Sequence, residues 1–274
     1  MRLDLRSDRD VLWPVVRVTE LWRYPVKSLQ GERLDVVRVG SDGLQGDRRF
    51  AIYDLATGFG LTARRVPELL FASARLLDDD RVEITLPDGS LARDDQALSN
   101  WLGRRVELWS ASAAVARRYE NVIDFERESA SEWAPFEGAA GPFHDSAGAR
   151  VSLLSTATIG PWDRRRFRPN VLLEGEGEDQ LVGSSIAFGS AILDVGMRIQ
   201  RCVITTRQQP GGIERDLSVM RTIARERNAR LAVGAVVRQP GLVRVGDTPE
   251  TVTDRAGQRT LAEAPARATS HQPA

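Results

Sequence analysis

The chain contains one thiol, Cys202, and Arg201 directly precedes it. A guanidinium beside a thiol favours the thiolate, which is the form that attacks electrophiles and binds soft metals. A free cysteine is also common as a small apolar core residue, so this segment alone leaves an inert thiol open. A cysteine protease is disfavoured, because neither His144 nor His271 lies in a recognisable pairing motif.

Lysine is equally rare, because Lys27 is the only lysine among 38 basic side chains. Codon bias explains such a count, and so does a position that requires a compact ammonium. Lys27 stands next to Ser28, and an ammonium beside a hydroxyl suits an anionic group such as phosphate. Arg48 follows Asp47, whose carboxylate is placed to hold the guanidinium in a fixed direction. Taken singly, each segment fits an ordinary surface loop equally well.

A third polar segment precedes a short apolar run. Arg168 and Asn170 bracket Pro169 just before the run at 171–173, which gives a rigid site with directed donors and acceptors. The alternative is a plain turn at the entry to a strand.

The composition narrows the function classes. The chain has 274 residues with 38 acidic and 38 basic side chains, so neither nucleic-acid binding nor membrane-surface attachment is expected. No apolar run approaches the about 20 residues of a membrane span. The charged start, MRLDLRSDRD, lacks the apolar stretch of a signal peptide, so we expect a cytoplasmic protein. One cysteine excludes a disulfide within the chain and an iron–sulfur cluster held by this chain alone.

The elements that must position these residues are mainly strands. Short, turn-bounded β-branched runs predict a mostly β protein of the α+β class. Strands are expected at 15–21, 34–39, 49–53, 71–77, 81–86, 171–173, 185–188, 191–195, 203–206, 231–237 and 241–247. Helices are expected at 94–103, 155–159 and 217–228. The mixed segment 126–148 is interpreted as a connection, and residues 1–13 as a loose lead-in.

Taken in order, these segments resemble the MOSC family, named for the C-terminal domain of molybdenum-cofactor sulfurases. The matching segments are Tyr24–Ser28, Gly43–Arg48, Leu61–Arg64, Phe167–Asn170, Arg201-Cys202 and Val243–Asp247. The resemblance implies two β-barrel domains with a few short helices. A MOSC-type N-terminal β-barrel domain would occupy 14–125, a MOSC domain 126–250, and a disordered tail 251–274.

The resemblance is closest to the amidoxime-reducing component type. It implies a molybdenum-cofactor-dependent oxidoreductase that reduces N-hydroxylated small molecules, with Cys202 as the catalytic thiolate and metal ligand. The residues that would hold the pterin and its phosphate are Lys27, Ser28, Arg48, Asp145, Ser146, Arg168, Asn170 and Arg201. No internal electron relay is evident, so a separate electron donor of the ferredoxin or flavoprotein type is expected.

Two other functions stay open at this stage. One is a carrier that transfers cofactor or sulfur through a Cys202 persulfide, and the other is a metal-free domain that binds another phosphorylated ligand. The chain also departs from its relatives after the ligand cysteine. It reads Arg207-Gln208-Gln209-Pro210-Gly211-Gly212 where relatives often show a Pro-Asp-Thr-Gly-like turn, which bears on the pocket rim and hence on the substrate.

Overall fold

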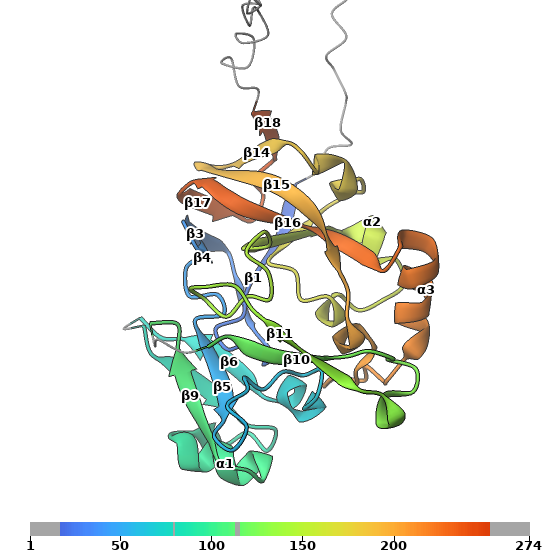
Figure 1. Ribbon diagram of the computed structural model, residues 1–274. Coiled ribbons are helices and arrows are strands. Elements are labelled where there is room, and N and C mark those ends of the chain that lie inside the picture. Colours follow the sequence, from blue (N-terminus) through green and yellow to red (C-terminus); the bar gives the residue numbers. More distant parts are fainter. Residues whose placement is uncertain (1–16, 79, 113–115, 253–274) are drawn as a thin grey trace, which may run out of the picture.

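The computed structural model describes residues 17–78, 80–112 and 116–252. Strands dominate and the α-helices are short, which confirms the predicted mostly β class (Figure 1). The α-helices lie where they were predicted: α1 (Asp95–Leu102), α2 (Thr156–Ile159) and α3 (Leu217–Arg227). Within the described ranges, no helix is long and apolar enough to cross a membrane. The predicted lead-in at 1–13 and residues 253–274 of the predicted tail lie outside the described residues.

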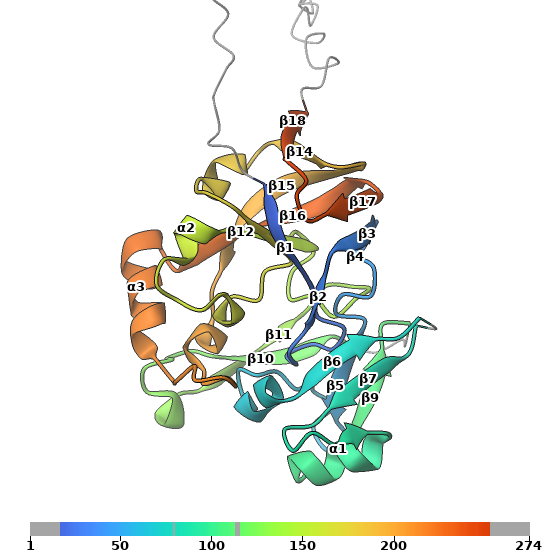
Figure 2. The same ribbon diagram turned by 180° about the vertical axis from the view of Figure 1, so that it is seen from behind.

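An eight-stranded sheet forms the larger part of the fold. Its strands, in spatial order, are β18 (Glu250–Val252), β14 (Ser185–Phe188), β15 (Ala191–Gln200), β16 (Arg230–Gln239), β12 (Val151–Ser155), β13 (Val171–Leu173), β1 (Val18–Arg23) and β2 (Glu32–Leu34). Only the β12–β13 pair is parallel. Because β1 pairs with β13, with Leu21 opposite Val171, the first strands complete a sheet built mainly by the second half of the chain (Figure 2).

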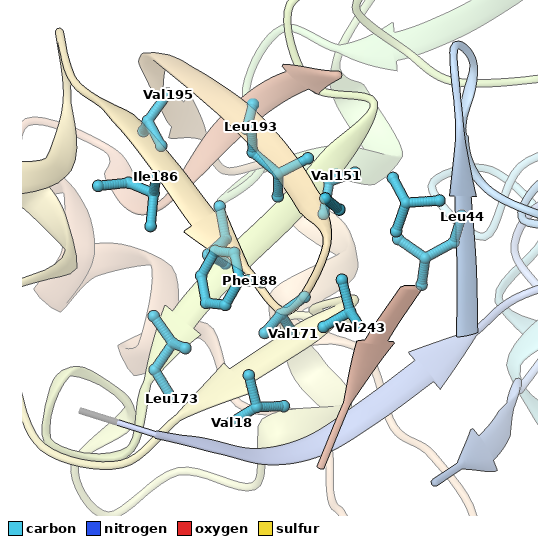
Figure 3. Packing of buried hydrophobic residues seen from close by; sticks show 14 of the residues in the cluster. Val18, Leu44, Val151, Val171, Leu173, Ile186, Phe188, Leu193, Val195 and Val243 are labelled. Atoms are coloured by element: carbon cyan, nitrogen blue, oxygen red, sulfur yellow. The ribbon is translucent and has the colours of Figure 1, made fainter. Parts of the chain in front are cut away.

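A small three-stranded sheet packs against the same core. It consists of β17 (Gly241–Arg244), β3 (Val36–Gly40) and β4 (Gly43–Leu44). Figure 3 shows Leu44 and Val243 from this sheet gathered with Phe188 and Leu193 from the large one. Burial of each such side chain contributes about 1.5–3 kcal/mol. Since the β1–β13 and β3–β17 pairs both join the two halves of the chain, the domain boundary at 125/126 stays a prediction.

A second core lies among the elements in the lower part of Figure 1. It lies among α1 and five strands: β5 (Phe50–Asp54), β6 (Ser73–Leu76), β7 (Val82–Thr85), β8 (Leu91–Ala92) and β9 (Val106–Ser110). The Asp94 carboxylate caps α1 by accepting from the Ala97 amide at 2.8 Å, and Gly103 ends the helix at φ 63°. Both ends follow the capping chemistry of the sequence.

One sequence-based prediction is wrong, and one connecting segment contains a strand that was not predicted. The strand expected at 203–206 is the 3₁₀ turn η5 (Val203–Thr206), in which the Thr206 hydroxyl donates to the Val203 carbonyl at 2.8 Å. Threonine hydroxyls can satisfy backbone groups locally, so a β-branched run need not become a strand. The connection expected at 126–148 contains β11 (Trp133–Glu137), which pairs with β10 (Arg118–Val122). Pro135 obscured this strand, because proline lacks the ladder donor, and it is tolerated in a two-stranded hairpin whose strands are both edges.

Candidate functional site

A cavity of about 570 Å³ brings together residues from both halves of the chain. All nine residues of the predicted site line it: Lys27, Ser28, Arg48, Asp145, Ser146, Arg168, Asn170, Arg201 and Cys202. The β10–β11 hairpin contributes an apolar wall through Ala134, Pro135 and Phe136. The cavity is therefore lined by both cationic and apolar side chains.

Strand β15 leads the chain to the thiol. The strand ends at Gln200, and Cys202 then precedes the turn η5. The Cys202 carbonyl accepts from both the amide and the hydroxyl of Thr205 at 3.1 Å, which fixes the backbone at the cysteine. Cys202 is half-buried, and its thiol is free.

A carboxylate bridges two cations beside the thiol. Asp145 accepts from Lys27 Nζ through Oδ1 and from Arg64 Nη2 through Oδ2, each at 2.5 Å. Burial acts to raise the pKa of Asp145, but Arg64 and Lys27 outweigh it and hold the pKa well below its usual range. Burial acts to lower the pKa of Arg64, whereas Asp145 and Cys202 raise it more strongly. The Arg64 guanidinium thus pairs with the carboxylate in the cavity that Cys202 also lines.

Lys27 is largely engaged by the protein itself. Its ammonium donates to the Phe143 carbonyl at 2.8 Å as well as to Asp145, and it lies 4.2 Å from the centre of the Tyr119 ring. Burial lowers the pKa of Lys27 to about 8, although Asp145 opposes this shift. Because an ammonium has three N–H donors and two are used here, the predicted contact of Lys27 with a ligand phosphate stays a prediction.

Two arginines lie over the buried Tyr24 ring. The Arg168 guanidinium is 4.2 Å and that of Arg48 is 5.0 Å from the ring centre. Asp47 pairs with Arg48, as the sequence predicted, and also accepts from the Tyr24 amide at 2.8 Å. Nη1 of Arg168 is buried and has no hydrogen-bond partner among the described residues. Burial lowers the pKa of Arg168 to about 10.

Three residues of the cavity adopt a left-handed backbone conformation that side chains other than glycine seldom take. They are Ser28 at φ 72°, Arg48 at 49° and Arg168 at 52°. Each such position costs on the order of 1–3 kcal/mol, and strain of this kind clusters at binding sites. Two of the three are the arginines over Tyr24. The fold therefore maintains an unfavourable backbone conformation at two arginines that line the cavity.

The remaining predicted residues have partners within the protein. Arg201 donates to the Phe167 carbonyl at 2.5 Å, and burial lowers its pKa to about 10. Asn170 accepts from the Ser152 amide at 3.1 Å and donates to the Trp22 carbonyl at 3.2 Å, so it ties β1 and β12 together. Ser28 Oγ accepts from the Ala63 amide at 3.0 Å.

Sequence reasoning missed several cavity residues. Arg64 ends one of the segments that match the family but was not assigned to the site, although its guanidinium contacts Asp145. His144, Arg166 and Phe136 also line the cavity, and no local pattern singled them out. Burial is the largest cause that holds the pKa of His144 well below its ordinary value, so this ring adds no charge to the cavity.

Two family profiles match the chain. The MOSC N-terminal beta barrel domain matches residues 15–129, and the MOSC domain matches residues 142–250. The chain belongs to the MOSC family. Among curated proteins, this MOSC protein is 26% identical over 247 residues to a molybdenum cofactor sulfurase of Drosophila grimshawi, with 81% of this chain and 32% of that protein covered. The chain thus spans about a third of that relative's length.

Solved structures resemble this MOSC protein more distantly. The YUAD protein from Bacillus subtilis has a TM-score of 0.42 at 13% identity, with 86% of this chain and 94% of that chain covered. YiiM from Geobacillus stearothermophilus has a TM-score of 0.33 at 15% identity, with 51% of this chain and 74% of that chain covered.

The family and the sulfurase relative link this MOSC protein to the molybdenum cofactor. The cavity residues fit such a group, which carries a phosphate and a soft metal. Nη1 of the half-buried Arg168 is a buried donor that no described residue satisfies, and an anion would satisfy it. The free thiol of Cys202 on the same cavity is the soft donor that suits molybdenum.

Proposed function

We propose that this MOSC protein is a molybdenum-cofactor-dependent oxidoreductase that reduces N-hydroxylated small molecules. The observation that carries the proposal is the shared cavity. The only thiol of the chain opens into the same 570 Å³ space as the unsatisfied Arg168 donor and the strained Arg48 backbone.

The cationic residues that line the cavity would hold the phosphate of the pterin. Arg168 and Arg48 are the main candidates, because the first has a free buried donor and the second is oriented by Asp47. Arg201 and Ser146 would contact the rest of the group, and the Cys202 thiolate would bind the metal. When bound, the cofactor supplies two-electron oxygen-atom transfer chemistry, which side chains alone do not provide.

The protein's own residues would bind and orient the substrate, supply protons and exclude water from the cavity. The reaction is R–NHOH + 2 e⁻ + 2 H⁺ → R–NH₂ + H₂O, so two protons must reach the cavity. Lys27 holds a proton on Nζ with a pKa of about 8, whereas Asp145 stays ionised at neutral pH. The apolar wall, which includes Phe136, would exclude water and pack against the substrate body.

Electrons would come from a separate protein of the ferredoxin or flavoprotein type. The chain has one cysteine, and that residue is assigned to the metal, so the sequence offers no cysteine-held relay of its own. The reductant is therefore external in this proposal.

A second candidate function is a carrier that transfers cofactor or sulfur through a Cys202 persulfide. One observation favours it: the curated relative is named a molybdenum cofactor sulfurase. In this case Arg64 would stabilise the negative charge of the persulfide, since Arg64 and Cys202 line the same cavity.

The test is to make the protein in a host that synthesises the molybdenum cofactor. Metal and pterin content are measured first, and reduction of a hydroxylamine or amidoxime with a chemical electron donor follows. Bound molybdenum with turnover supports the reductase. Sulfur transfer from a Cys202 persulfide without N–O reduction supports the carrier, and a protein that retains neither metal nor pterin contradicts both.

A further inference from the structure

We propose that Arg166 is a positioning residue for Cys202: its guanidinium fixes the turn behind the thiol and so keeps the sulfur at the cavity wall. The inference rests on the proposed function only in taking Cys202 as the working thiol.

Arg166 forms hydrogen bonds with the backbone that follows the cysteine. It belongs to the 3₁₀ turn η3 (Arg164–Arg166), and only 7% of it is exposed. Nη1 donates to the carbonyls of Thr205 and Arg207 at 3.1 and 3.2 Å, and Nη2 donates to the Glu214 carbonyl at 2.7 Å. One planar group thereby joins the end of turn η5 to the far side of the loop at 207–214.

The same turn connects directly to the thiol. Thr205, whose carbonyl Arg166 binds, also donates its amide and hydroxyl to the Cys202 carbonyl. Any shift of Thr205 therefore moves the cysteine backbone. Since hydrogen bonds made by a charged donor are stronger than neutral ones, Arg166 restrains this residue more firmly than the turn alone would.

A second arginine anchors the turn from the opposite direction. Arg207 is buried, and its guanidinium pairs with Glu128 and donates to the Arg64 carbonyl. Glu128 lies between β10 and β11 in the short turn η2 (Glu128–Ala130), so the loop after Cys202 is tied both to the hairpin and to the backbone of Arg64. Arg166 binds the Arg207 carbonyl, which places the two arginines in one network.

Arg164, on the same turn, faces elsewhere and provides a control, whereas Arg165 donates to the Pro210 carbonyl at 2.8 Å and so also contacts the loop at 207–214. Arg164 pairs with Glu20 at 2.6 Å and lies 3.8 Å from the centre of the Trp22 ring. It does not line the cavity that holds Cys202. Arg166 can make three carbonyl contacts because its donors form a rigid fork, whereas a lysine ammonium is a point donor on a flexible stem.

Thiol labelling tests the proposal, because Cys202 is the only thiol in the chain. In cofactor-free full-length protein, we expect a bulky maleimide to label Arg166→Gln at least about tenfold faster than the unchanged protein, since the substitution removes three charge-assisted hydrogen bonds. Arg166→Lys is expected to restore an intermediate rate. Arg164→Gln is expected to label within about twofold of the unchanged protein, because its contacts do not reach the turn.

An unchanged labelling rate in folded Arg166→Gln overturns the proposal. Equal acceleration by Arg164→Gln also overturns it, because it shows general loosening rather than release of this turn. If Arg166→Gln does not fold, the labelling rate of Arg166→Lys tests the proposal instead. We expect Arg166→Lys to be labelled faster than the unchanged protein, and an unchanged rate would contradict the assignment. None of these labelling rates depends on molybdenum or turnover, so the experiment tests the role of Arg166 even if the reductase proposal fails.

Discussion

Replacing Arg168 by glutamine is expected to have opposite effects on the empty and the loaded protein. In the empty protein, Nη1 of Arg168 is buried without a hydrogen-bond partner among the described residues. A buried donor that lacks a hydrogen-bond partner costs stability, so its removal relieves that cost. In the loaded protein, the same guanidinium would bind the cofactor phosphate, and its removal weakens binding.

The size of the binding effect follows from the hydrogen bond that the substitution removes. A charge-assisted hydrogen bond contributes about 1.5–3 kcal/mol. Since about 1.4 kcal/mol corresponds to a tenfold change, cofactor affinity is expected to fall by about 10- to 150-fold. The stacking of Arg168 on Tyr24, at 4.2 Å, disappears in both states. That stacking contributes about 0.5–2 kcal/mol, which is similar to the cost of a buried unsatisfied donor, about 1–3 kcal/mol.

The assay combines pterin quantification with thermal unfolding. Arg168→Gln is compared with Arg38→Gln, which changes an exposed arginine on β3. We expect Arg168→Gln to be purified with far less pterin and, once both proteins are cofactor-free, to unfold at the same or a higher temperature than the unchanged protein. Full pterin content in Arg168→Gln would refute the reasoning, and so would a clearly lower unfolding temperature of its cofactor-free form.

Three further predictions follow from the cavity. Lys27→Ala should lower pterin content about tenfold or more if Lys27 contacts the phosphate; full occupancy in a pterin assay would remove Lys27 from the ligand set. The pKa of Asp145 is lowered in the folded protein, so its stabilising effect is present above about pH 4, the ordinary value, and is lost as the pH falls. Urea unfolding at pH 6 and pH 3 should therefore show a smaller acid-induced loss of stability in Asp145→Asn than in the unchanged protein, and equal losses would argue against the ion pairs. Reduced nicotinamide alone should support negligible turnover, with activity appearing when a flavoprotein and ferredoxin are added; sustained turnover without them would disprove the need for a separate donor.

The sequence predicted the elements whose signals are local. Helix α1 was predictable because Asp94 and Gly103 carry the capping chemistry of its two ends. The apolar alternation that places Leu193 and Val195 in the large core likewise requires only a period of two. Elements governed by hydroxyl or proline chemistry were misread, as η5 and β11 show.

The contacts of the cavity could not be predicted in the same way. Arg64 and Asp145 are 81 positions apart in the chain, and no pattern in either segment indicates the other. The hydrogen bonds from Arg166 to three carbonyls could not be predicted from the sequence either. Every residue has a backbone carbonyl, and only the fold determines which carbonyls lie close to this guanidinium. The resemblance to the MOSC family supplied nine of the residues that line the cavity, while the other lining residues and the partners required the structure.

The most direct measurement is the rate of N–O reduction per bound pterin in Cys202→Ser, with molybdenum content determined on the same sample. Serine keeps the size of the side chain but removes the soft donor that would bind the metal. The pterin should be retained, because its phosphate contacts are assigned to Arg48 and Arg168, whereas reduction of a hydroxylamine or amidoxime should be abolished. A Cys202→Ser protein that reduces its substrate at the rate of the unchanged protein would contradict the assignment of Cys202 as the metal ligand.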